Sequence, residues 1–316
     1  MHAVHEPHIP IIAVVGPTAS GKSHLAVELA KWKQTEVVSA DSMQIYREMS
    51  IGTAKPTLQE QEGIVHHLID FVDLSQPFSV ADYVSLAKKC VQSIYDQGKI
   101  PILVGGTGLY IRSFLENLSF SEQDRDEALR LALAQKAKEK GIQELVEELK
   151  SFDPESAERI DPNNLPRLIR AIEVYRTTGE TMTQQIQRSR QTPSPYQVCM
   201  IGLDYADRQV LYDRINRRVD QMLEQGLVEE ARRVLAQPNS KTALQAIGYK
   251  ELQPYFEGEI SLEQAAENMK QETRRYAKRQ LTWFRREKKI HWIYPDECGG
   301  DQVVQQAKEI VVRTLG

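Results

Sequence analysis

Residues 16–23 read GPTASGKS, and this stretch decides the fold of the chain around it. Its spacing, Gly16-x-x-x-x-Gly21-Lys22-Ser23, fits a P-loop, in which backbone N–H groups crowd round a phosphate, lysine neutralises charge and the serine hydroxyl can meet Mg²⁺. IPIIAVV at 9–15 has the composition of a buried strand, and HLAVELAKWK at 24–33 has helical apolar spacing. The loop therefore lies where a helix N-terminus points at an anion, and we expect it to bind phosphate or diphosphate. The expected phosphate-binding residues are Gly16, Pro17, Thr18, Ala19, Ser20, Gly21, Lys22 and Ser23.

Length and composition set the limits within which the loop is interpreted. A chain of 316 residues with 41% hydrophobic residues can form one large α/β domain and a smaller one. The net charge of −4 provides no global attraction to nucleic acid, so any such binding must come from local basic patches. The three cysteines are far apart and lack metal-ligand spacing, which suggests free thiols in a reducing compartment. No apolar run approaches the ~18 residues of a membrane span, and we expect a cytoplasmic protein without membrane contact.

The first third of the chain alternates strand-like and helix-like stretches. After the P-loop helix come TEVVSAD at 35–41, HHLIDFVDL at 66–74, a helix near 79–97 and KIPILVGG at 99–106. This alternation predicts a parallel sheet with helices on both faces, whose ligands bind at the carboxyl ends of the strands. Three strand ends therefore matter most: the P-loop, residues 40–42 and residues 105–107.

The rest of the chain departs from this alternating pattern in two successive parts. We expect residues 1–116 to form the first part of the α/β core, 117–195 a charged helical insertion, and 196–316 the completion of the core. RQTPSPY at 190–196 is the expected hinge after the insertion. The last part is predicted to contain one strand near 197 and helices at 207–223, 226–236, 261–289 and 301–314.

Asp41 and Thr107 stand at two of these strand ends, and each has two interpretations. Asp41 either caps the following turn or serves as a base beside the phosphate site. Thr107, within GGTGLY, is either a helix N-cap or part of a channel where glycines let a substrate approach the backbone. The strand IPILV ends in Gly-Gly-Thr rather than in the acid that usually orders Mg²⁺ and water for hydrolysis, which favours group transfer. Asp41, Asp70 or Asp73 could still serve a metal.

Two basic stretches are ambiguous in the same way. Arg214, Arg217 and Arg218 in DRINRRVDQML are either solvated helix partners or a guanidinium group for a leaving diphosphate. ETRRYAKRQLTWFRREKK at 272–289 mixes cations with aromatics, which suits RNA. Helical spacing equally allows the charges to be solvated while four other residues pack inward: Tyr276, Gln280, Trp283 and Phe284.

The ordered set of motifs resembles one known family. GPTASGKS, SADSMQIYREMSIGTAKP, HHLID, VGGTGLY, DPNNLPRLIRAIEV, RINRRVDQML, QAIGYKEL and AKRQLTWFR follow one another over about residues 10–290 as in the tRNA dimethylallyltransferases, also called tRNA isopentenyltransferases. The resemblance implies a P-loop NTPase-like core with a helical insertion. It also implies a monomeric enzyme that transfers a dimethylallyl group from dimethylallyl diphosphate to N6 of the adenine just 3′ of the anticodon, position 37, in tRNAs reading codons that begin with U. Diphosphate is released and Mg²⁺ assists.

The resemblance also implies roles for individual residues. By family position Asp41 is the general base, Thr107 belongs to the substrate channel and Arg218 holds the diphosphate, with Arg217 the alternative if the register slips by one. Ser23 is the expected Mg²⁺ ligand. The expected contacts with the tRNA anticodon stem-loop are Asp41, Ser42, Met43, Gln44, Thr107, Arg130, Arg167, Arg170, Gln245, Gly248, Tyr249 and Lys250.

Two other functions share some of these features. An adenylate isopentenyltransferase would share the P-loop and the acid but has little use for the insertion or the basic C-terminal helix. A P-loop kinase or an NTP-dependent RNA-binding protein would transfer phosphate from ATP, or bind it, and needs a metal-holding acid that the sequence does not clearly offer.

Overall fold

A computed structural model describes residues 8–118, 126–189, 192–238 and 243–316. The chain divides into two compact units, residues 1–115 with 195–316 and residues 116–194. The boundaries expected from the sequence each differ from these by one residue. Two of the seven residues of the expected hinge, 190 and 191, lie outside the described residues.

The first unit is built on a six-stranded sheet in the order β3-β2-β4-β1-β5-β6, and every strand pair is parallel. The strands are β1 (Ile9–Val15), β2 (Val37–Ser39), β3 (His66–His67), β4 (Ile102–Gly105), β5 (Tyr196–Leu203) and β6 (Ile290–Ile293). Val15 pairs with both Gly105 and Gly202, so β1, β4 and β5 end at the same edge. The predicted α/β class with a parallel sheet is confirmed.

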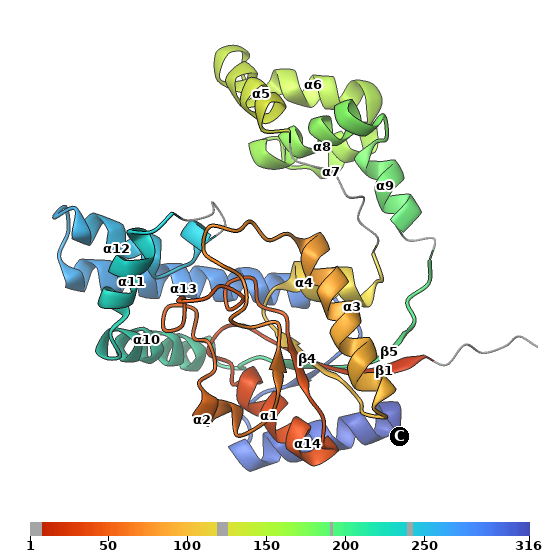
Figure 1. Cartoon of the computed structure of the whole chain (residues 1–316), viewed down its shortest axis with the longest axis vertical. Coiled ribbons are helices and arrows are strands. Elements are labelled where there is room, and N and C mark those ends of the chain that lie inside the picture. Colours follow the sequence, from red (N-terminus) through yellow and green to blue (C-terminus); the bar gives the residue numbers. More distant parts are fainter. Residues whose placement is uncertain (1–7, 119–125, 190–191, 239–242) are drawn as a thin grey trace, which may run out of the picture. The chain divides into compact units, whose positions relative to one another are not determined.

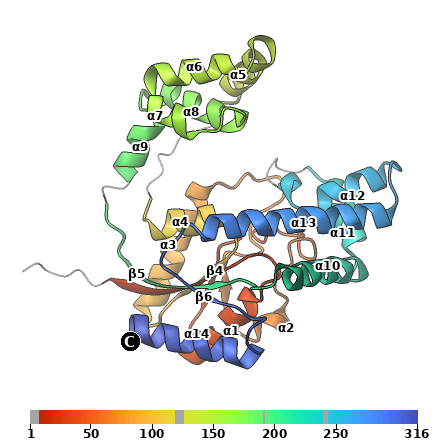
Figure 2. The same ribbon diagram turned by 180° about the vertical axis from the view of Figure 1, so that it is seen from behind.

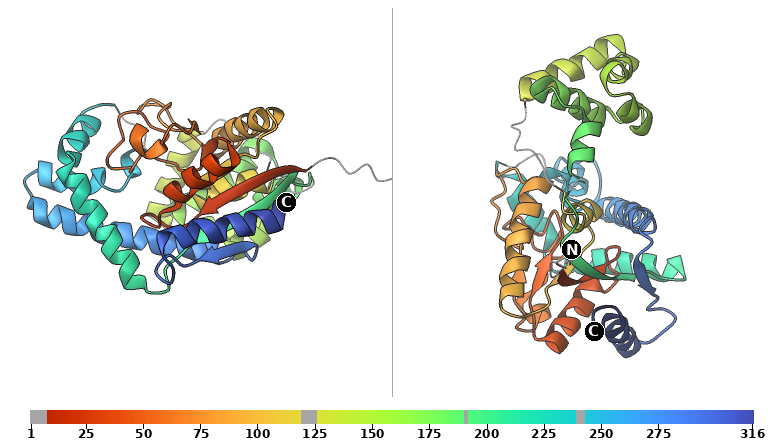
Figure 3. Two further views of the ribbon diagram at one scale, coloured as in Figure 1. Left: turned by 90° about the horizontal axis from the view of Figure 1, so that it is seen from below. Right: turned by 90° about the vertical axis from the view of Figure 1, so that its right-hand side faces the viewer.

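Helices cover both faces of this sheet (Figures 1 and 2). The helices of the unit are α1 (Lys22–Lys33), α2 (Leu58–Gln61), α3 (Val80–Asp96), α4 (Gly108–Leu115), α10 (Arg208–Glu224), α11 (Leu227–Leu235), α12 (Tyr249–Phe256), α13 (Leu262–Phe284) and α14 (Gly300–Leu315), with a 3₁₀ turn at Ala243–Gln245. Figure 3 shows α1 and α14 on one side of the strands. Helices α3, α4 and α11 to α13 pack on the other side.

The sequence of β1 explains these two layers. Ile12 and Val14 point into the core shared with α1 and α14, whereas Ile11, Ala13 and Val15 point into the core on the opposite face. A strand that is buried on both faces reads as a continuous apolar run, as IPIIAVV does. The polar groups at the carboxyl end of β1 are therefore the first that can meet a ligand.

The helix beginnings follow local capping rules. The Ser79 hydroxyl accepts a hydrogen bond from the Asp82 N–H, and the Asp82 carboxylate accepts one in return from the Ser79 N–H, which starts α3. Ser261 caps α13 by accepting from the Gln264 N–H. The apolar residues of α13 then recur every three or four positions, which places Ala277, Gln280 and Leu281 on its buried face.

The second unit is helical throughout its described residues. It comprises α5 (Glu127–Lys140), α6 (Gln143–Phe152), α7 (Pro154–Arg159), α8 (Leu165–Thr178) and α9 (Met182–Ser189). Its separate core contains Leu133, Leu145, Leu149, Leu168 and Ile172, each at most 2% exposed.

Two sequence-based predictions about elements are wrong. The stretch at 66–74 forms only the two-residue strand β3, because Leu68 and Asp70 adopt positive φ angles of 61° and 58° that end the extended path. The helix expected at 261–289 ends at Phe284, and the chain then forms β6, a second strand in a region where one was expected. Across the described ranges, no helix combines the length and the apolar character that a membrane span requires.

Candidate active site

A cavity of about 320 Å³ opens at the carboxyl edge of the sheet. Its walls come from the P-loop, the turn at 41–44, the loop at 52–54, helix α10, residues 245–250 and helix α13. The cavity therefore joins two of the three strand ends that the sequence singled out. The third, at 105–107, contacts the walls through hydrogen bonds described below.

The P-loop takes the conformation that its glycines permit. Gly21 is the N-cap of α1 at φ 94°, in the left-handed region where a side chain is strained. At Gly16 an added Cβ would lie 2.8 Å from the Leu203 carbonyl oxygen, so the loop can pass β5 only without a side chain. The first amides of α1 have no partner within the helix and present a positive terminus to the cavity.

Lys22 and Arg218 form the cationic end of the cavity. Burial, and then the neighbouring Arg218 guanidinium, lower the pKa of Lys22 to about 8, while Asp41 acts in the opposite direction. Burial also lowers the pKa of Arg218. Among the described residues Arg218 has no ion-pair partner. Two cations held together at low exposure are electrostatically costly, and an anion between them removes that cost.

The structure separates Arg214, Arg217 and Arg218 of α10. Arg218 lines both the cavity and an outer depression over the P-loop, whereas Arg217 is exposed and lines only the depression. Arg214 donates through Nε to the carbonyl oxygen of Ala19, 2.9 Å away, and so buttresses the P-loop backbone. Arg218 is thus the arginine with access to an anion in the cavity.

Asp41 shows that both of its interpretations apply at once. Its Oδ1 accepts hydrogen bonds from the backbone N–H groups of Met43 and Gln44 at 2.8 and 3.2 Å, which caps the turn. Its Oδ2 has no hydrogen-bond partner among the described residues, and the residue lines the cavity. One oxygen positions the carboxylate and the other is available as an acceptor.

Thr107 is linked to the same turn. Its Oγ1 accepts a hydrogen bond from the Ser42 N–H at 3.1 Å, and its N–H donates to the Ala40 carbonyl oxygen. Its hydroxyl also donates to the Ser42 Oγ at 3.4 Å and lies near the phenol of Tyr276 of α13. Burial raises the pKa of Tyr276 above its ordinary value, so its hydroxyl stays protonated and the phenol is neutral. Thr107 thus contacts the wall rather than lining the cavity.

Gln44 and the loop at 50–54 form the next part of the wall. The Gln44 Nε2 donates to the carbonyl oxygens of Thr53 and Ala54 at 3.1 and 3.0 Å, which fixes its Oε1 as the outward group. Glu230 of α11 holds the loop: its carboxylate accepts from the backbone N–H groups of residues 50, 51 and 52 and from the Tyr249 hydroxyl. A fully satisfied buried carboxylate therefore shapes one side of the cavity.

The RNA contacts expected at 245–250 are only partly accessible. Gln245 and Lys250 line the cavity and are exposed. The Tyr249 side chain is 0% exposed and donates to Glu230, and Gly248 is buried. The predicted RNA contacts of Tyr249 and Gly248 are therefore wrong: the residues support the wall instead.

The arginines of the second unit have a structural role. The carboxylate of Glu173, which is 0% exposed, accepts two hydrogen bonds at 2.9 Å from Arg130 and one at 2.8 Å from Arg170. Burial alone would raise the pKa of Glu173, but these hydrogen bonds lower it. Arg167 is exposed and its guanidinium has no ion-pair partner among the described residues.

Oxygen donors that suit Mg²⁺ lie at the cavity. Ser23 and Asp41 both line it, together with a smaller recess that Ser39 also borders. The Ser20 hydroxyl is buried without a hydrogen-bond partner among the described residues. Hard oxygen ligands fit Mg²⁺. The other acids considered for a metal, Asp70 and Asp73, are paired with Lys55 and Arg47.

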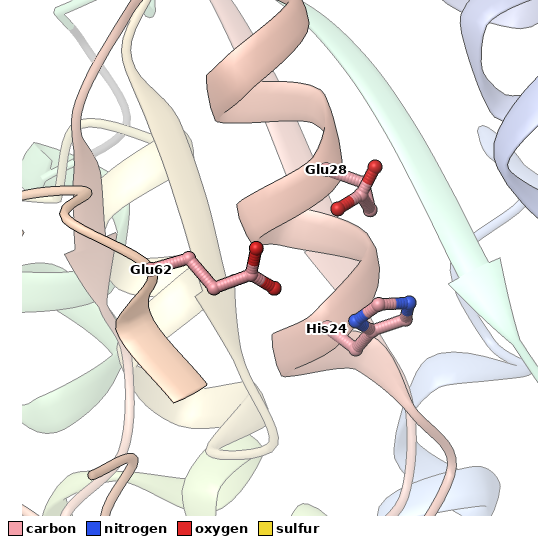
Figure 4. Close-up of side chains that lie close together, drawn as sticks. All are labelled: His24, Glu28 and Glu62. Carbon is pink, nitrogen blue, oxygen red and sulfur yellow. The ribbon is translucent and has the colours of Figure 1, made fainter. Parts of the chain in front are cut away.

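Figure 4 shows a second group of possible ligands, His24, Glu28 and Glu62, outside the cavity. The ammonium group of Lys31 donates to both carboxylates at 2.6 Å. Lys31 therefore already neutralises Glu28 and Glu62, and the group forms a surface ion-pair network.

The fold and the cavity define a P-loop enzyme of the group-transfer class, with a cationic phosphate end and a carboxylate in one chamber. The family model for IPP transferase matches residues 44–287. The tRNA dimethylallyltransferase of Thermoanaerobacter sp. strain X514 is 50% identical over 293 residues, which cover 92% of this chain and 93% of the relative. The enzyme of that name from Acetivibrio thermocellus is 48% identical over 97% of this chain and 98% of its own length.

Solved structures of proteins with related names are also similar to this chain. The full-length tRNA isopentenylpyrophosphate transferase of Bacillus halodurans superposes with a TM-score of 0.73 at 42% identity, covering 97% of each chain. A eukaryotic dimethylallyltransferase acting on tRNA gives 0.78 at 28% identity, over 96% of this chain and 80% of that one. The chain belongs to the IPP transferase family.

Glu230 escaped the sequence-based interpretation of the site. Tyr276 and Gln280 were expected only as inward-packing residues of the helix, the alternative to an RNA surface, and their places at the cavity were not predicted. The helical spacing of α13 is the local signal that placed them inward.

Proposed function

We propose that this chain transfers a dimethylallyl group from dimethylallyl diphosphate to N6 of adenine 37 of tRNAs reading codons that begin with U. The observation that carries the proposal is a single cavity that has Lys22 and Arg218 at one end and an unengaged Asp41 oxygen on its wall. Membership of a family whose curated relatives are tRNA dimethylallyltransferases makes tRNA prenylation the activity, and the cavity supplies its chemistry.

The cationic end suits the leaving group. As the allylic carbon–oxygen bond breaks, negative charge builds on the departing diphosphate. The Lys22 ammonium, the Arg218 guanidinium and the free amides at the start of α1 are positioned to stabilise that charge before it develops. No phosphoryl group is transferred, so an acid that orders a hydrolytic water is not needed.

The carboxylate suits the nucleophile. An exocyclic adenine amine is weakly nucleophilic, and removal of its proton as the new carbon–nitrogen bond forms lowers the barrier. The Asp41 Oδ2 accepts that proton, while Oδ1 stays bonded to the turn and keeps the side chain aimed. The outward Oε1 of Gln44 offers a second acceptor for the amino group.

The apolar part of the cavity wall suits the five-carbon group. It includes Ile215, Val219, Met222, Ala246 and Met269. They form no hydrogen bonds with a prenyl chain and exclude water, which would otherwise compete with N6 for the activated carbon. To enter such a chamber the base must leave its stack.

Mg²⁺ is a proposal with narrower support. The Ser23 hydroxyl, with Asp41 nearby on the same wall, would hold the ion, which would supply further neutralisation of the diphosphate when bound. We further propose a cytoplasmic monomer, since one chain supplies every group of the cavity.

The test offers carbon-labelled dimethylallyl diphosphate and, separately, γ-labelled ATP to the chain, each with unmodified tRNA and with free AMP. The proposal expects label from the prenyl donor in tRNA and none in AMP. Label in AMP would place the chain with the adenylate isopentenyltransferases, and label transfer only from ATP would place it with the kinases.

A further inference from the structure

One buried amide joins two of the strand ends that frame the cavity. Gln280 of α13 is 5% exposed. Its Oε1 accepts a hydrogen bond from the Thr18 N–H at 2.9 Å, and its Nε2 donates to the Gly106 carbonyl oxygen at 3.0 Å. Thr18 belongs to the P-loop after β1, and Gly106 follows β4. The amide thus links the phosphate loop to the segment that carries Thr107.

The contact requires a side chain that offers both an acceptor and a donor, as the amide of Gln280 does. Thr18 offers a donor and Gly106 an acceptor, and only a side chain with one acceptor and one donor satisfies both. The fit is also tight, because a Cβ at Gly106 would lie 2.1 Å from the Gln280 Nε2. A methionine here would leave both backbone groups unpaired, and a carboxylate would place two acceptors against each other.

The linked segments carry groups on both sides of the proposed reaction. Thr18 is four residues before Lys22. Thr107 accepts from the Ser42 N–H, and its own N–H donates to the Ala40 carbonyl oxygen, so it is bonded to both neighbours of Asp41. The pairing of β1, β4 and β2 brings these segments together, and Gln280 adds two hydrogen bonds beyond the strand ends that fix the P-loop against the segment at 106–107.

We propose that Gln280 is a positioning residue for prenyl transfer: it sets the distance between the P-loop and the segment at 106–107, and so the distance between the donor carbon and N6. This role rests on the proposed function. A displacement of about 1 Å between reacting groups lowers the rate roughly 100-fold, so the effect belongs mainly in kcat.

The experiment compares Gln280→Glu and Gln280→Met with the wild-type chain. The kcat and the KM for dimethylallyl diphosphate are measured with a tRNA anticodon stem-loop between about pH 5.5 and pH 8.5, each normalised to wild type at the same pH. A protonated carboxyl donates to Gly106 and accepts from Thr18, as the amide does. The charged groups facing the cavity are Lys22 of α1, Asp41 after β2, Arg218 of α10, Lys250 of α12 and Arg279 of α13, beside the neutral Tyr276.

We expect Gln280→Met to lower kcat about 10- to 100-fold at every pH, with a much smaller change in KM. Gln280→Glu is equally impaired at high pH, where the carboxyl is ionised, and recovers to within about threefold of wild type as pH falls through its pKa. A merely structural residue gives no such recovery, even if both variants unfold at a lower temperature.

Wild-type kcat in Gln280→Met, or an impaired Gln280→Glu that does not recover at low pH, overturns the inference. If the wild-type chain itself transfers no prenyl group, the proposed function fails and the role of Gln280 falls with it. The wild-type measurement therefore separates the two failures.

Discussion

The two oxygens of Asp41 do different things, and this division decides how the residue can be tested. Oδ1 holds the turn at 42–44 through two backbone N–H groups, and Oδ2 is left for the substrate. Replacement by alanine removes both functions and cannot tell them apart. Asparagine keeps an acceptor oxygen for the turn and loses the base.

We therefore expect Asp41→Asn to lower kcat by about 10² to 10⁴, the usual contribution of a general base, with little change in the thermal unfolding midpoint. Steady-state kinetics with the stem-loop substrate measure this. Near-normal kcat in Asp41→Asn together with a damaged Asp41→Ala would leave Asp41 only its role in the turn.

Arg218 and Arg217 are adjacent but differ in access to the cavity. Arg218→Ala should lower kcat about 100-fold, because a charge that stabilises the leaving diphosphate is lost. Arg217→Ala is the matched control and should stay within about threefold of wild type, since an exposed cation is screened by solvent. If the larger loss follows Arg217→Ala, the assignment of the diphosphate arginine is reversed.

Lys22 should give the free enzyme a pH dependence. Its lowered pKa of about 8 means that the ammonium loses its proton above about pH 8, and the affinity for the anionic diphosphate then falls. Binding of dimethylallyl diphosphate, followed by calorimetry, should weaken as pH rises through 8 and should take up protons there. Lys22→Arg stays charged and should lack this decline. Equal pH dependence in both proteins would contradict the role of Lys22.

At the scale of elements, Glu230 on α11 fixes a loop that lies about 180 positions earlier in the chain, as its bond to the Ser50 N–H shows. Glu230→Gln supplies one acceptor oxygen where three backbone N–H groups and the Tyr249 phenol need two. We expect a loss of about 2–3 kcal/mol in unfolding free energy, measured with urea. Tyr249→Phe removes one bond and leaves the loop held, so it should cost only about 1 kcal/mol. Equal stability of Glu230→Gln and wild type would show that the loop is held by other contacts.

The elements that the sequence predicts best are those with a local cause. The P-loop strand and helix, α3 with its Ser79 cap, and β4 each carry their signal within a dozen residues. The end of α13 and the strand β6 do not, because IHWI becomes a strand only by pairing with β5, 90 positions away. The early end of β3 could not be predicted either, because the positive φ angle at Leu68 leaves no signal in the apolar pattern of the sequence.

The candidate site follows the same rule. Lys22 and Asp41 stand in short motifs at strand ends, and their place at one sheet edge follows from parallel strands. Arg218 lies on α10, and only the family resemblance chose it among its neighbours. Gln280 bonds a residue 262 positions away, and only the fold brings the two together. For Tyr249 the motif correctly predicts that its segment lies at the cavity, but it does not show which way the side chain points. In the fold the Tyr249 side chain is buried and donates to Glu230.

At the scale of the whole molecule, one unit contains the cavity and the other is a helical body with its own core. In the helical unit, Arg130 and Arg170 neutralise the buried carboxylate of Glu173, so both guanidinium groups have a structural role in that unit. RNA affinity of the chain must then come from cations without such partners, in line with the net charge of −4.

The central claim is that one cavity brings a prenyl diphosphate and the amino group of adenine 37 together. The most direct measurement uses carbon-labelled dimethylallyl diphosphate with an anticodon stem-loop that carries either adenine or unsubstituted purine at position 37, followed by nucleoside analysis of the RNA and assay of released diphosphate. The account predicts labelled N6-dimethylallyladenosine from the adenine stem-loop, one diphosphate per transfer, and no transfer to purine. Equal labelling of both stem-loops, or diphosphate release without label in RNA, would contradict it.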